Sequence, residues 1–220
     1  MQNLSANIKE IFESIQGEGL YTGQKQIFVR FSKCNLNCKY CDTDFISNKS
    51  YSTADLFNIL KKMQSDTISF TGGEPLMELD FLIEFLKNYK DKLNKKIYLE
   101  TNGTLFNHLS KIIDYIDIVA MDIKLKSATG EENNFVNNEK FLEIANKKEV
   151  FIKVVYDNNI QDTEIKSVIS LAKKQDNTVV LQPKMPIDKD FNVTIAFNKF
   201  YNNYKNIRLI PQVHKFLNIM

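Results

Sequence analysis

The stretch Cys34-Asn-Leu-Asn-Cys38-Lys-Tyr-Cys41 contains every cysteine of the chain. Three thiolates at this C-x3-C-x2-C spacing can bind three corners of a four-iron, four-sulfur cluster from a single loop. The fourth iron then has no cysteine ligand and keeps an open coordination position. The stretch therefore predicts an iron–sulfur site that binds and activates a small molecule.

A zinc site and a set of inert buried cysteines are the alternatives for the same residues. Structural zinc takes four protein ligands, and only His108 and His214, both distant in the sequence, could complete the set. Inert cysteines have no reason to occur at such a spacing. Tyr40, before the last cysteine, suits a cluster, because an aromatic ring there can shield the cluster and stack on a ligand.

The composition is that of an ordinary globular protein. Of the 220 residues, 43% are apolar and 25% are charged, and the formal net charge is +2. These values fit a single domain over residues 1–220 and give no reason to expect nucleic-acid binding. No apolar run reaches the roughly 18 residues of a membrane span, and the first residues do not read as a signal peptide. The odd, clustered cysteine count predicts a reducing cytoplasm.

Short β-rich runs alternate with helical patterns along the chain. The predicted strands are Ile27–Ser32, Thr67–Phe70, Lys96–Glu100, Ile116–Met121, Val150–Tyr156, Thr178–Leu181 and Asn206–Leu209. The predicted helices include Leu56–Met63, Leu79–Leu86, Phe106–Asp114, Glu139–Lys147, Ile165–Ala172 and Thr194–Tyr204, the first preceded by a capping box of Ser52 and Asp55. This alternation predicts βαβ units and a parallel sheet. About six repeats are too few for an eight-fold barrel, so we expect an α/β fold, a single-domain partial (β/α)6-type barrel.

Polar and glycine-rich motifs follow the predicted strands, where barrel enzymes have their active sites. In Thr71-Gly72-Gly73-Glu74-Pro75 the glycines let the backbone approach a ligand closely. Glu100-Thr101-Asn102-Gly103 offers a carboxylate and an amide that could bind a ribose diol. Asp122-Ile123-Lys124 and Gln182-Pro183 follow the fourth and sixth strands. Each motif alone could also be an ordinary turn or a surface residue.

Together, the cysteine spacing, the aromatic residue before the last cysteine and the Gly-Gly-Glu-Pro turn resemble the radical S-adenosylmethionine (SAM) enzymes. The resemblance implies a radical SAM core with Cys34, Cys38 and Cys41 as catalytic cluster ligands and SAM on the open iron. It implies that SAM is cleaved to a 5′-deoxyadenosyl radical, which takes a hydrogen from the substrate. The implied SAM contacts are Tyr40, Asp42, Gly73, Glu74, Glu100, Asn102, Lys124, Ser127 and Gln182.

The segment before the cysteines narrows the family. In Ile15-Gln16-Gly17-Glu18-Gly19, Gln16 and Glu18 offer an amide and a carboxylate, which suit the amide face of a pterin or purine. Arg30 could bind a carboxylate in bidentate fashion. A flexible turn and a salt-bridged strand residue are the plainer interpretations. From Phe12 onward the chain resembles the 7-carboxy-7-deazaguanine synthases, although the Ser-Pro-Lys of many members is absent from residues 124–129.

This second resemblance implies a complete reaction. A carbon–nitrogen lyase converts 6-carboxy-5,6,7,8-tetrahydropterin to 7-carboxy-7-deazaguanine with loss of ammonia, in queuosine and deazapurine biosynthesis. Mg2+ bound by Thr43 meets the substrate carboxylate. Residues 1–26 form a substrate-binding segment, and residues 206–220 form a tail that folds over the substrate. The implied substrate contacts are Ile15, Gln16, Gly17, Glu18, Arg30, Thr71, His214 and Met220.

The same resemblance implies a homodimer, an electron donor such as flavodoxin, and no direct contact with nucleic acid or a membrane. Two other functions stay open. A glycyl-radical-enzyme activase shares the cysteine motif and a comparable length, but it does not need Gln16-Gly17-Glu18 or His214. A non-catalytic iron–sulfur electron carrier or a zinc protein would leave the motifs at the strand ends unexplained.

Overall fold

The strands form one open, curved sheet. The computed structural model describes residues 4–39, 41 and 49–219, and within them nine strands are hydrogen-bonded in the order β3-β1-β2-β4-β5-β6-β7-β8-β9. The strands are β1 Ser5–Ile15, β2 Lys25–Phe31, β3 Ser50–Ser52, β4 Thr67–Gly72, β5 Lys96–Thr101, β6 Ile118–Ile123, β7 Glu149–Tyr156, β8 Val179–Pro183 and β9 Ile207–Leu209. From β2 to β9 neighbouring strands are parallel, whereas β1 is antiparallel to β2 and β3.

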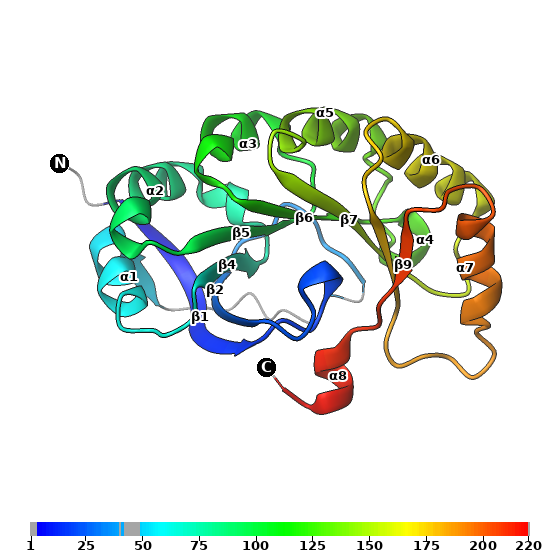
Figure 1. Ribbon diagram of the computed structural model, residues 1–220, viewed down its shortest axis with the longest axis horizontal. Helices are drawn as coiled ribbons and strands as arrows, with labels where there is room; N and C mark the ends of the chain where they lie inside the picture. Colours follow the sequence, from blue (N-terminus) through cyan, green and yellow to red (C-terminus); the bar gives the residue numbers. More distant parts are fainter. Residues whose placement is uncertain (1–3, 40, 42–48, 220) are drawn as a thin grey trace.

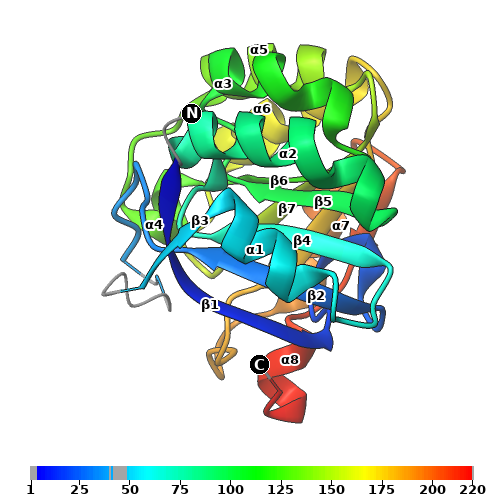
Figure 2. The same ribbon diagram turned by 90° about the vertical axis from the view of Figure 1, so that its left-hand side faces the viewer.

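Helices cover the convex face of this sheet. They are α1 Thr53–Leu60, α2 Leu79–Leu93, α3 Phe106–Ile112, α4 Lys126–Thr129, α5 Phe135–Ala145, α6 Asp162–Lys173, α7 Val193–Tyr201 and α8 Val213–Leu217, with short 3-10 turns η1 Gly19–Tyr21, η2 Pro75–Glu78 and η3 Ile113–Tyr115. Figures 1 and 2 show α2, α3, α5 and α6 along the outside of the arch. In Figure 1, α8 lies below the arch, on the concave side. Among the described residues, no helix is long and apolar enough to cross a membrane.

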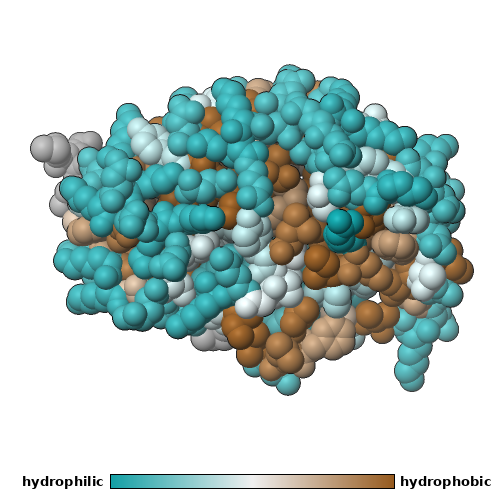
Figure 3. Space-filling model, viewed as in Figure 1, coloured by the Kyte–Doolittle hydropathy of each residue, from teal (hydrophilic) through white to brown (hydrophobic). Residues whose placement is uncertain are grey.

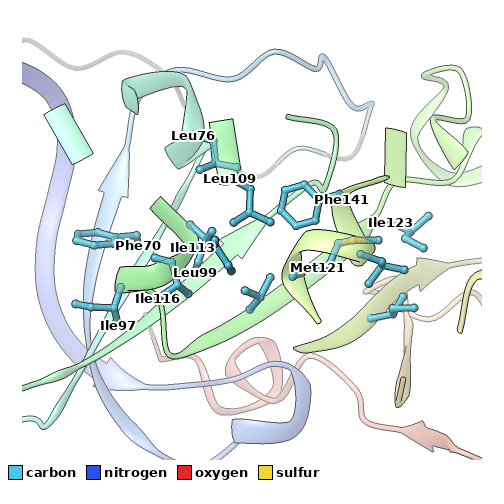
Figure 4. Packing of buried hydrophobic residues seen from close by; sticks show 14 of the residues in the cluster. Phe70, Leu76, Ile97, Leu99, Leu109, Ile113, Ile116, Met121, Ile123 and Phe141 are labelled. Carbon is cyan, nitrogen blue, oxygen red and sulfur yellow. The ribbon is translucent and has the colours of Figure 1, made fainter. Parts of the chain in front are cut away.

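The main core fills the space between the sheet and the outer helices. Side chains alternate between the two faces of a strand, so every second strand residue points into this core. Figure 4 shows Leu99 of β5 and Met121 of β6 in one cluster with Leu109 of α3 and Phe141 of α5. All four are fully buried. Burial contributes about 1.5–3 kcal/mol for each such side chain, which holds the helices on the sheet.

A second, smaller core lies on the concave face, near the amino ends of the strands. It consists of Tyr98, Ile118, Ala120, Phe151 and Val180, which we call the apolar layer. Tyr21 of η1 packs on it, with its ring centroid 5.6 Å from that of Tyr98 and 6.4 Å from that of Phe151. Gly19 has φ +70°, and a Cβ there would lie 2.6 Å from Phe151 Cε2. Glycine therefore lets η1 close this end of the barrel interior.

The fold predicted from the sequence is confirmed. All seven predicted strands correspond to parallel strands, with bounds that shift by at most two residues. The capping box is also present, since Asp55 N donates to Ser52 Oγ and Ser52 N donates to Asp55 Oδ2, both at 3.1 Å. The sequence did not reveal β1, β3, α4 or α8. A bulge between Ile8 and Glu10 explains the omission of β1, because it breaks the alternation by which a strand is recognised.

Candidate active site

The cysteine loop follows β2 and is held by its backbone. Glu74 N donates to Lys33 O at 2.7 Å, and Lys39 N donates to Thr129 O at 2.9 Å. At Gly73 a Cβ would lie 2.0 Å from Lys33 O, so glycine permits this approach. The Gly-Gly-Glu-Pro turn is therefore packed directly against the cysteine loop.

A ring of side-chain hydrogen bonds joins the cysteine loop to the turn after β5. Asn102 Nδ2 donates to Asn35 Oδ1 at 2.8 Å, and Asn35 Nδ2 donates to Thr104 Oγ1 at 2.9 Å. Thr104 Oγ1 in turn donates to Asn102 Oδ1 at 2.6 Å. The ring fixes the residue next to Cys34. Asn102, predicted to contact SAM, thus also positions the cysteine loop.

The cysteines line one cavity of about 120 Å³, which we call the cysteine cavity. Burial raises the pKa of the Cys34 thiol above its ordinary value and the pKa of Cys38 to about 11. Iron must therefore displace their protons when it binds. Within the described ranges, no three His, Cys, Asp or Glu side chains form a site for a single metal ion. The three thiols, including that of Cys41, instead border a common space.

A second cavity, of about 360 Å³, adjoins the first on the concave side, and we call it the polar cavity. Its lining includes these predicted substrate contacts: Ile15, Gln16, Gly17, Glu18, Arg30, Thr71 and His214. Both cavities are lined by Thr71, Gly72, Glu100, Asp122, Lys124 and Lys153. These residues come from β4, β5, β6 and β7 or directly follow β6. They form a shared wall between the two cavities.

The shared wall contains ion pairs, in which Lys153 is buried and the partners are partly exposed. Lys153 Nζ lies 2.5 Å from Glu18 Oε2 and 3.9 Å from Asp122 Oδ2. Lys124 Nζ lies 2.9 Å from the same Asp122 oxygen. Burial acts to raise the pKa of Glu18, but the charge and hydrogen bond of Lys153 outweigh it and lower that pKa to about 2. Glu18 is therefore a carboxylate at neutral pH.

Glu100 is fixed by two neighbours in the same wall. Gln16 Nε2 donates to Glu100 Oε1 at 2.9 Å, and Thr71 Oγ1 donates to Glu100 Oε2 at 2.8 Å. Gln16 Oε1 accepts from Glu18 N at 3.0 Å. Gln16 thus uses both ends of its amide to shape the N-terminal loop and to orient Glu100.

The C-terminal segment closes over the N-terminal loop. Val213 N donates to Gly17 O at 2.9 Å, and Gln212 Nε2 donates to Glu18 Oε1 at 2.6 Å. A Cβ at Gly17 would lie 2.4 Å from His214 Nδ1. The two segments therefore pack tightly, and together they border the polar cavity.

Arg30 is paired across the first two strands. Its Nε lies 2.6 Å from Glu10 Oε1, and Glu10 is its cross-strand partner. The guanidinium also lies over the ring of Phe12, at 5.8 Å from the centroid. Arg30 and Glu10 both line the polar cavity, so a positive charge is held at its border.

Similarity to known proteins extends over nearly the whole chain. The model of the Radical SAM superfamily matches residues 28–181. A 7-carboxy-7-deazaguanine synthase from Geobacter sulfurreducens is 32% identical, with 99% of each chain covered. Another from Thermoplasma acidophilum is 32% identical, with 96% of each chain covered. The chain belongs to the 7-carboxy-7-deazaguanine synthases of the radical SAM superfamily.

A solved structure agrees with the fold of this family. The crystal structure of QueE from Escherichia coli matches with a TM-score of 0.67 at 21% identity, and covers 96% of this chain and 95% of that chain. The family resemblance predicted from the sequence is thus confirmed. The cofactors of a radical SAM enzyme are a four-iron, four-sulfur cluster and SAM.

The residues present in this radical SAM chain fit those cofactors. Three thiols on one loop border a common space, next to a glycine turn that tolerates no Cβ. Among the described residues, Asp122 Oδ1 and both amide atoms of Gln182 are buried without a hydrogen-bond partner. Buried polar atoms are normally satisfied, and Asp122 lines both cavities, so its unpaired oxygen fits a polar ligand there.

The predicted SAM contacts fall into two groups in this 7-carboxy-7-deazaguanine synthase. Gly73, Glu100, Asn102 and Lys124 line the cysteine cavity. The lining of neither cavity includes the others that the structure describes, which are Glu74, Ser127 and Gln182. Ser127 N donates to Glu164 Oε1 at 3.0 Å. The predicted positions Tyr40, Asp42, Thr43 and Met220 lie outside the described residues.

Glu74 is a fully buried carboxylate under the cysteine loop. It accepts hydrogen bonds from Thr101 Oγ1 at 2.9 Å, Asn102 N at 2.8 Å and Leu76 N at 3.1 Å. Burial outweighs these bonds and raises the pKa of Glu74 to about 7. Its observed contacts hold the Gly-Gly-Glu-Pro turn to β5, and its contact with SAM stays a prediction.

Sequence reasoning missed several cavity residues of this radical SAM enzyme, among them Glu10, Lys153 and Gln212. One signal was available, because Lys153 interrupts the apolar run Phe151-Ile152-Lys153-Val154-Val155. A lysine in a buried parallel strand needs a partner. The partner, Glu18, comes from a distant loop that only the fold brings close.

Proposed function

We propose that the chain converts 6-carboxy-5,6,7,8-tetrahydropterin to 7-carboxy-7-deazaguanine with release of ammonia, as a carbon–nitrogen lyase. The observation that carries the proposal is the shared wall, which joins a cavity lined by the cysteines to one lined by Gln16, Glu18 and Arg30. A molecule in the polar cavity would contact the same wall residues as a cofactor in the cysteine cavity. The names of the relatives support this choice of reaction.

In this proposal Cys34, Cys38 and Cys41 hold three irons of the cluster, and Gly73 and Lys124 contact SAM. When bound, these cofactors supply a carbon-centred radical that takes a hydrogen atom from the substrate. The chain itself orients both ligands and keeps water away from the reacting atoms. The C-terminal segment supports the second task, since it packs on Gly17 at the border of the polar cavity.

The polar cavity offers groups that match the substrate. Glu18 is ionised, so it can accept N–H groups from the amide face of the pterin. Arg30 can bind the substrate carboxylate, as it now binds the carboxylate of Glu10. His214 lines the same cavity from the C-terminal segment. Anion, cation and amide groups thus converge on one space large enough for a bicyclic ring.

Mg2+ is part of the proposal. A hydroxyl oxygen of Thr43 would bind the ion, which would also meet the substrate carboxylate. Oxygen ligands are those that Mg2+ prefers. Thr43 lies outside the described residues, so this assignment rests on the sequence, and turnover measured with and without the metal tests it.

We also propose a cytoplasmic homodimer that receives electrons from a donor such as flavodoxin. Exposed apolar side chains that support a second copy include Leu20, Leu209, Phe216 and Leu217. Figure 3 shows apolar surface gathered at the lower edge of the molecule, where α8 lies in Figure 1. Large apolar patches commonly mark contact sites. A reducing compartment would keep the three cysteines available as thiolates.

The test is anaerobic turnover of the reconstituted protein with SAM, a reductant and 6-carboxy-5,6,7,8-tetrahydropterin. We expect the absorbance of a deazapurine to appear, and to increase when Mg2+ is added. Cys38→Ala should abolish SAM cleavage and turnover. The matched control is Asn37→Ala, because this neighbouring side chain is exposed; it should keep both activities.

Each contrary outcome has a distinct meaning. SAM cleavage by the wild type without any deazapurine would favour the glycyl-radical-enzyme activase. Zinc alone in anaerobically purified protein would contradict an iron–sulfur enzyme. Iron without SAM cleavage would favour an electron carrier. Retained SAM cleavage in Cys38→Ala would show that Cys38 is not a required cluster ligand.

A further inference from the structure

Lys153 is a buried lysine in the middle of the sheet. It lies on β7 between Asp122 of β6 and Val180 of β8, its direct cross-strand partners. Only 2% of its surface is exposed. It lines both the cysteine cavity and the polar cavity. Burying a lysine at such a place costs free energy unless the lysine is paired. The identity of its partner therefore indicates what the lysine is for.

The partner is Glu18, whose carboxylate is held at both oxygens. Lys153 Nζ lies 2.5 Å from Glu18 Oε2, and Gln212 Nε2 donates to Glu18 Oε1 at 2.6 Å. The two donors come from a central strand and from the C-terminal segment. A carboxylate has about four acceptor sites, so two held oxygens can still accept hydrogen bonds from a ligand. The pairing therefore fixes the carboxylate without consuming it.

The charges around the pair keep it ionised. Glu18 faces Lys153 of β7 and His214 of the C-terminal segment, and Lys153 also faces Glu100 and Asp122. Tyr98 of β5 is a further neighbour of Lys153. Burial acts to lower the pKa of Lys153, but Glu100, Glu18 and Asp122 together raise it above its ordinary value. Lys153 is thus a permanent cation at physiological pH.

We infer that Lys153 is a positioning residue, which fixes the ionised Glu18 in the polar cavity and thereby sets the affinity for the amide face of the substrate. The inference rests on the proposed function, since it gives Glu18 the pterin as its ligand. The plainer possibility is that Lys153 only neutralises buried carboxylates. The two differ in one respect: a positioning residue acts through Glu18, so its effect disappears when Glu18 no longer carries a charge.

The experiment compares the wild type with Lys153→Met, Glu18→Gln and the double variant, each loaded with its cluster. The Michaelis constant for 6-carboxy-5,6,7,8-tetrahydropterin is measured at saturating SAM. At neutral pH, Lys153→Met should raise this constant at least about tenfold, as expected when one partner of a buried charge pair is removed. It should change kcat by less than about threefold. Added to Glu18→Gln, the same substitution should change the constant by less than about threefold.

A pH profile gives a second readout. Without Lys153, burial should raise the pKa of Glu18 far above about 2, because desolvation is the largest influence on it. In Lys153→Met the Michaelis constant should therefore rise steeply as pH falls from about 8 to about 6. The wild type and the double variant should lack this additional dependence. His214 is present in the wild type and in all three variants, so it cannot cause a difference between their pH profiles.

Three results would overturn the inference. If Lys153→Met raised the Michaelis constant by the same factor in the wild type and in Glu18→Gln, Lys153 would have a merely structural role. A Michaelis constant in Lys153→Met that matches the wild type across the pH range would show no role. A wild type that never forms the deazapurine would overturn the proposed function and this inference together. If Lys153→Met does not fold, the comparison of Glu18→Gln with the double variant still decides, because the double variant leaves no unpaired charge at residue 18: a further tenfold rise would contradict positioning.

Discussion

The two ends of the barrel interior are built by the same strands in opposite ways. The amino ends carry the apolar layer, and the carboxyl ends carry the shared wall. On neighbouring strands the pairs are Tyr98 and Glu100, Ala120 and Asp122, and Phe151 and Lys153. Members of each pair are two residues apart, so they point to the same face of the sheet. A shift of two residues along a strand thus changes the interior from apolar to charged.

This difference teaches where stability and binding reside. Apolar burial contributes about 25 cal/mol for each Å² removed from water. Buried ion pairs contribute little net stability, because desolvation offsets their attraction. The wall also contains Asp122 Oδ1, which is buried without a partner among the described residues. We therefore assign stability to the apolar layer and ligand binding to the wall.

The strongest test of the comparison is Phe151→Ala in the apolar layer. Phe151 is fully buried beneath Tyr21, so its truncation should lower the free energy of unfolding by about 3–5 kcal/mol. Anaerobic urea denaturation measures this loss. The control is Phe216→Ala on α8, where the side chain is 55% exposed and the loss should stay below about 1 kcal/mol. If both substitutions lowered the free energy of unfolding equally, the apolar layer would not be a special source of stability.

Two carboxylates with oppositely shifted pKa values sharpen the comparison further. Glu18 has a lysine beside it and a pKa of about 2, whereas burial raises the pKa of Glu74 to about 7. A raised carboxyl pKa means that the folded state binds the proton more tightly than the unfolded state. Stability conferred by Glu74 is therefore present below the unfolded pKa of about 4.5 and is lost, by about 3 kcal/mol, as pH rises through about 7.

Glu74→Gln should remove this dependence. Relative to the wild type without SAM, the variant should gain stability as the pH is raised, by about 3 kcal/mol in total. Urea denaturation of both proteins at several pH values gives the difference. A difference that shrinks with rising pH would mean that the hydrogen bonds from Thr101, Asn102 and Leu76 outweigh burial.

Gln182→Leu tests whether polar groups near the wall reduce stability. Gln182 is fully buried, and its amide atoms have no hydrogen-bond partner in the described part of the chain. Leucine should therefore increase the free energy of unfolding by about 1–2 kcal/mol and weaken SAM binding, measured by calorimetry. The control, Gln26→Leu, should destabilise, because Gln26 is equally buried but bonded to Gln16 and Gln24. If both substitutions lowered the free energy of unfolding, polar groups near the wall would not reduce stability.

The smallest expected effect concerns the ring that fixes the cysteine loop. Asn35→Ala removes its hydrogen bonds to Asn102 and Thr104. It should cost about 1 kcal/mol and speed the release of iron to a chelator severalfold. Asn37→Ala is the matched control and should release iron at the wild-type rate. Identical rates in both variants would show that the ring does not position the cysteine loop.

Most of the fold could be predicted from the sequence, because parallel strands buried on both faces leave continuous apolar runs such as Ile118–Met121. The strand β1 could not, since the bulge between Ile8 and Glu10 breaks the alternation of its side chains. The cysteine cavity was predictable because its motifs are contiguous and each follows a strand. The proposed substrate contacts Gln16 and His214 came from family resemblance.

What the sequence could not provide is pairing between distant segments. Lys153 meets Glu18, and Glu18 meets Gln212, only through strand register and the fold of the C-terminal segment. Glu10 faces Arg30 because of the register after the bulge. Such partners have no fixed spacing in the sequence. The sequence alone therefore does not distinguish them from ordinary charged residues of the surface.

The wall common to the two cavities has a thermodynamic consequence. Residues such as Asp122 and Lys153 line both cavities at once, so occupancy of one cavity would alter the electrostatic environment of the other. Reciprocity then applies: the factor by which the pterin changes the dissociation constant of SAM equals the factor by which SAM changes that of the pterin. Order of addition can change the rate of assembly of the ternary complex but not its free energy.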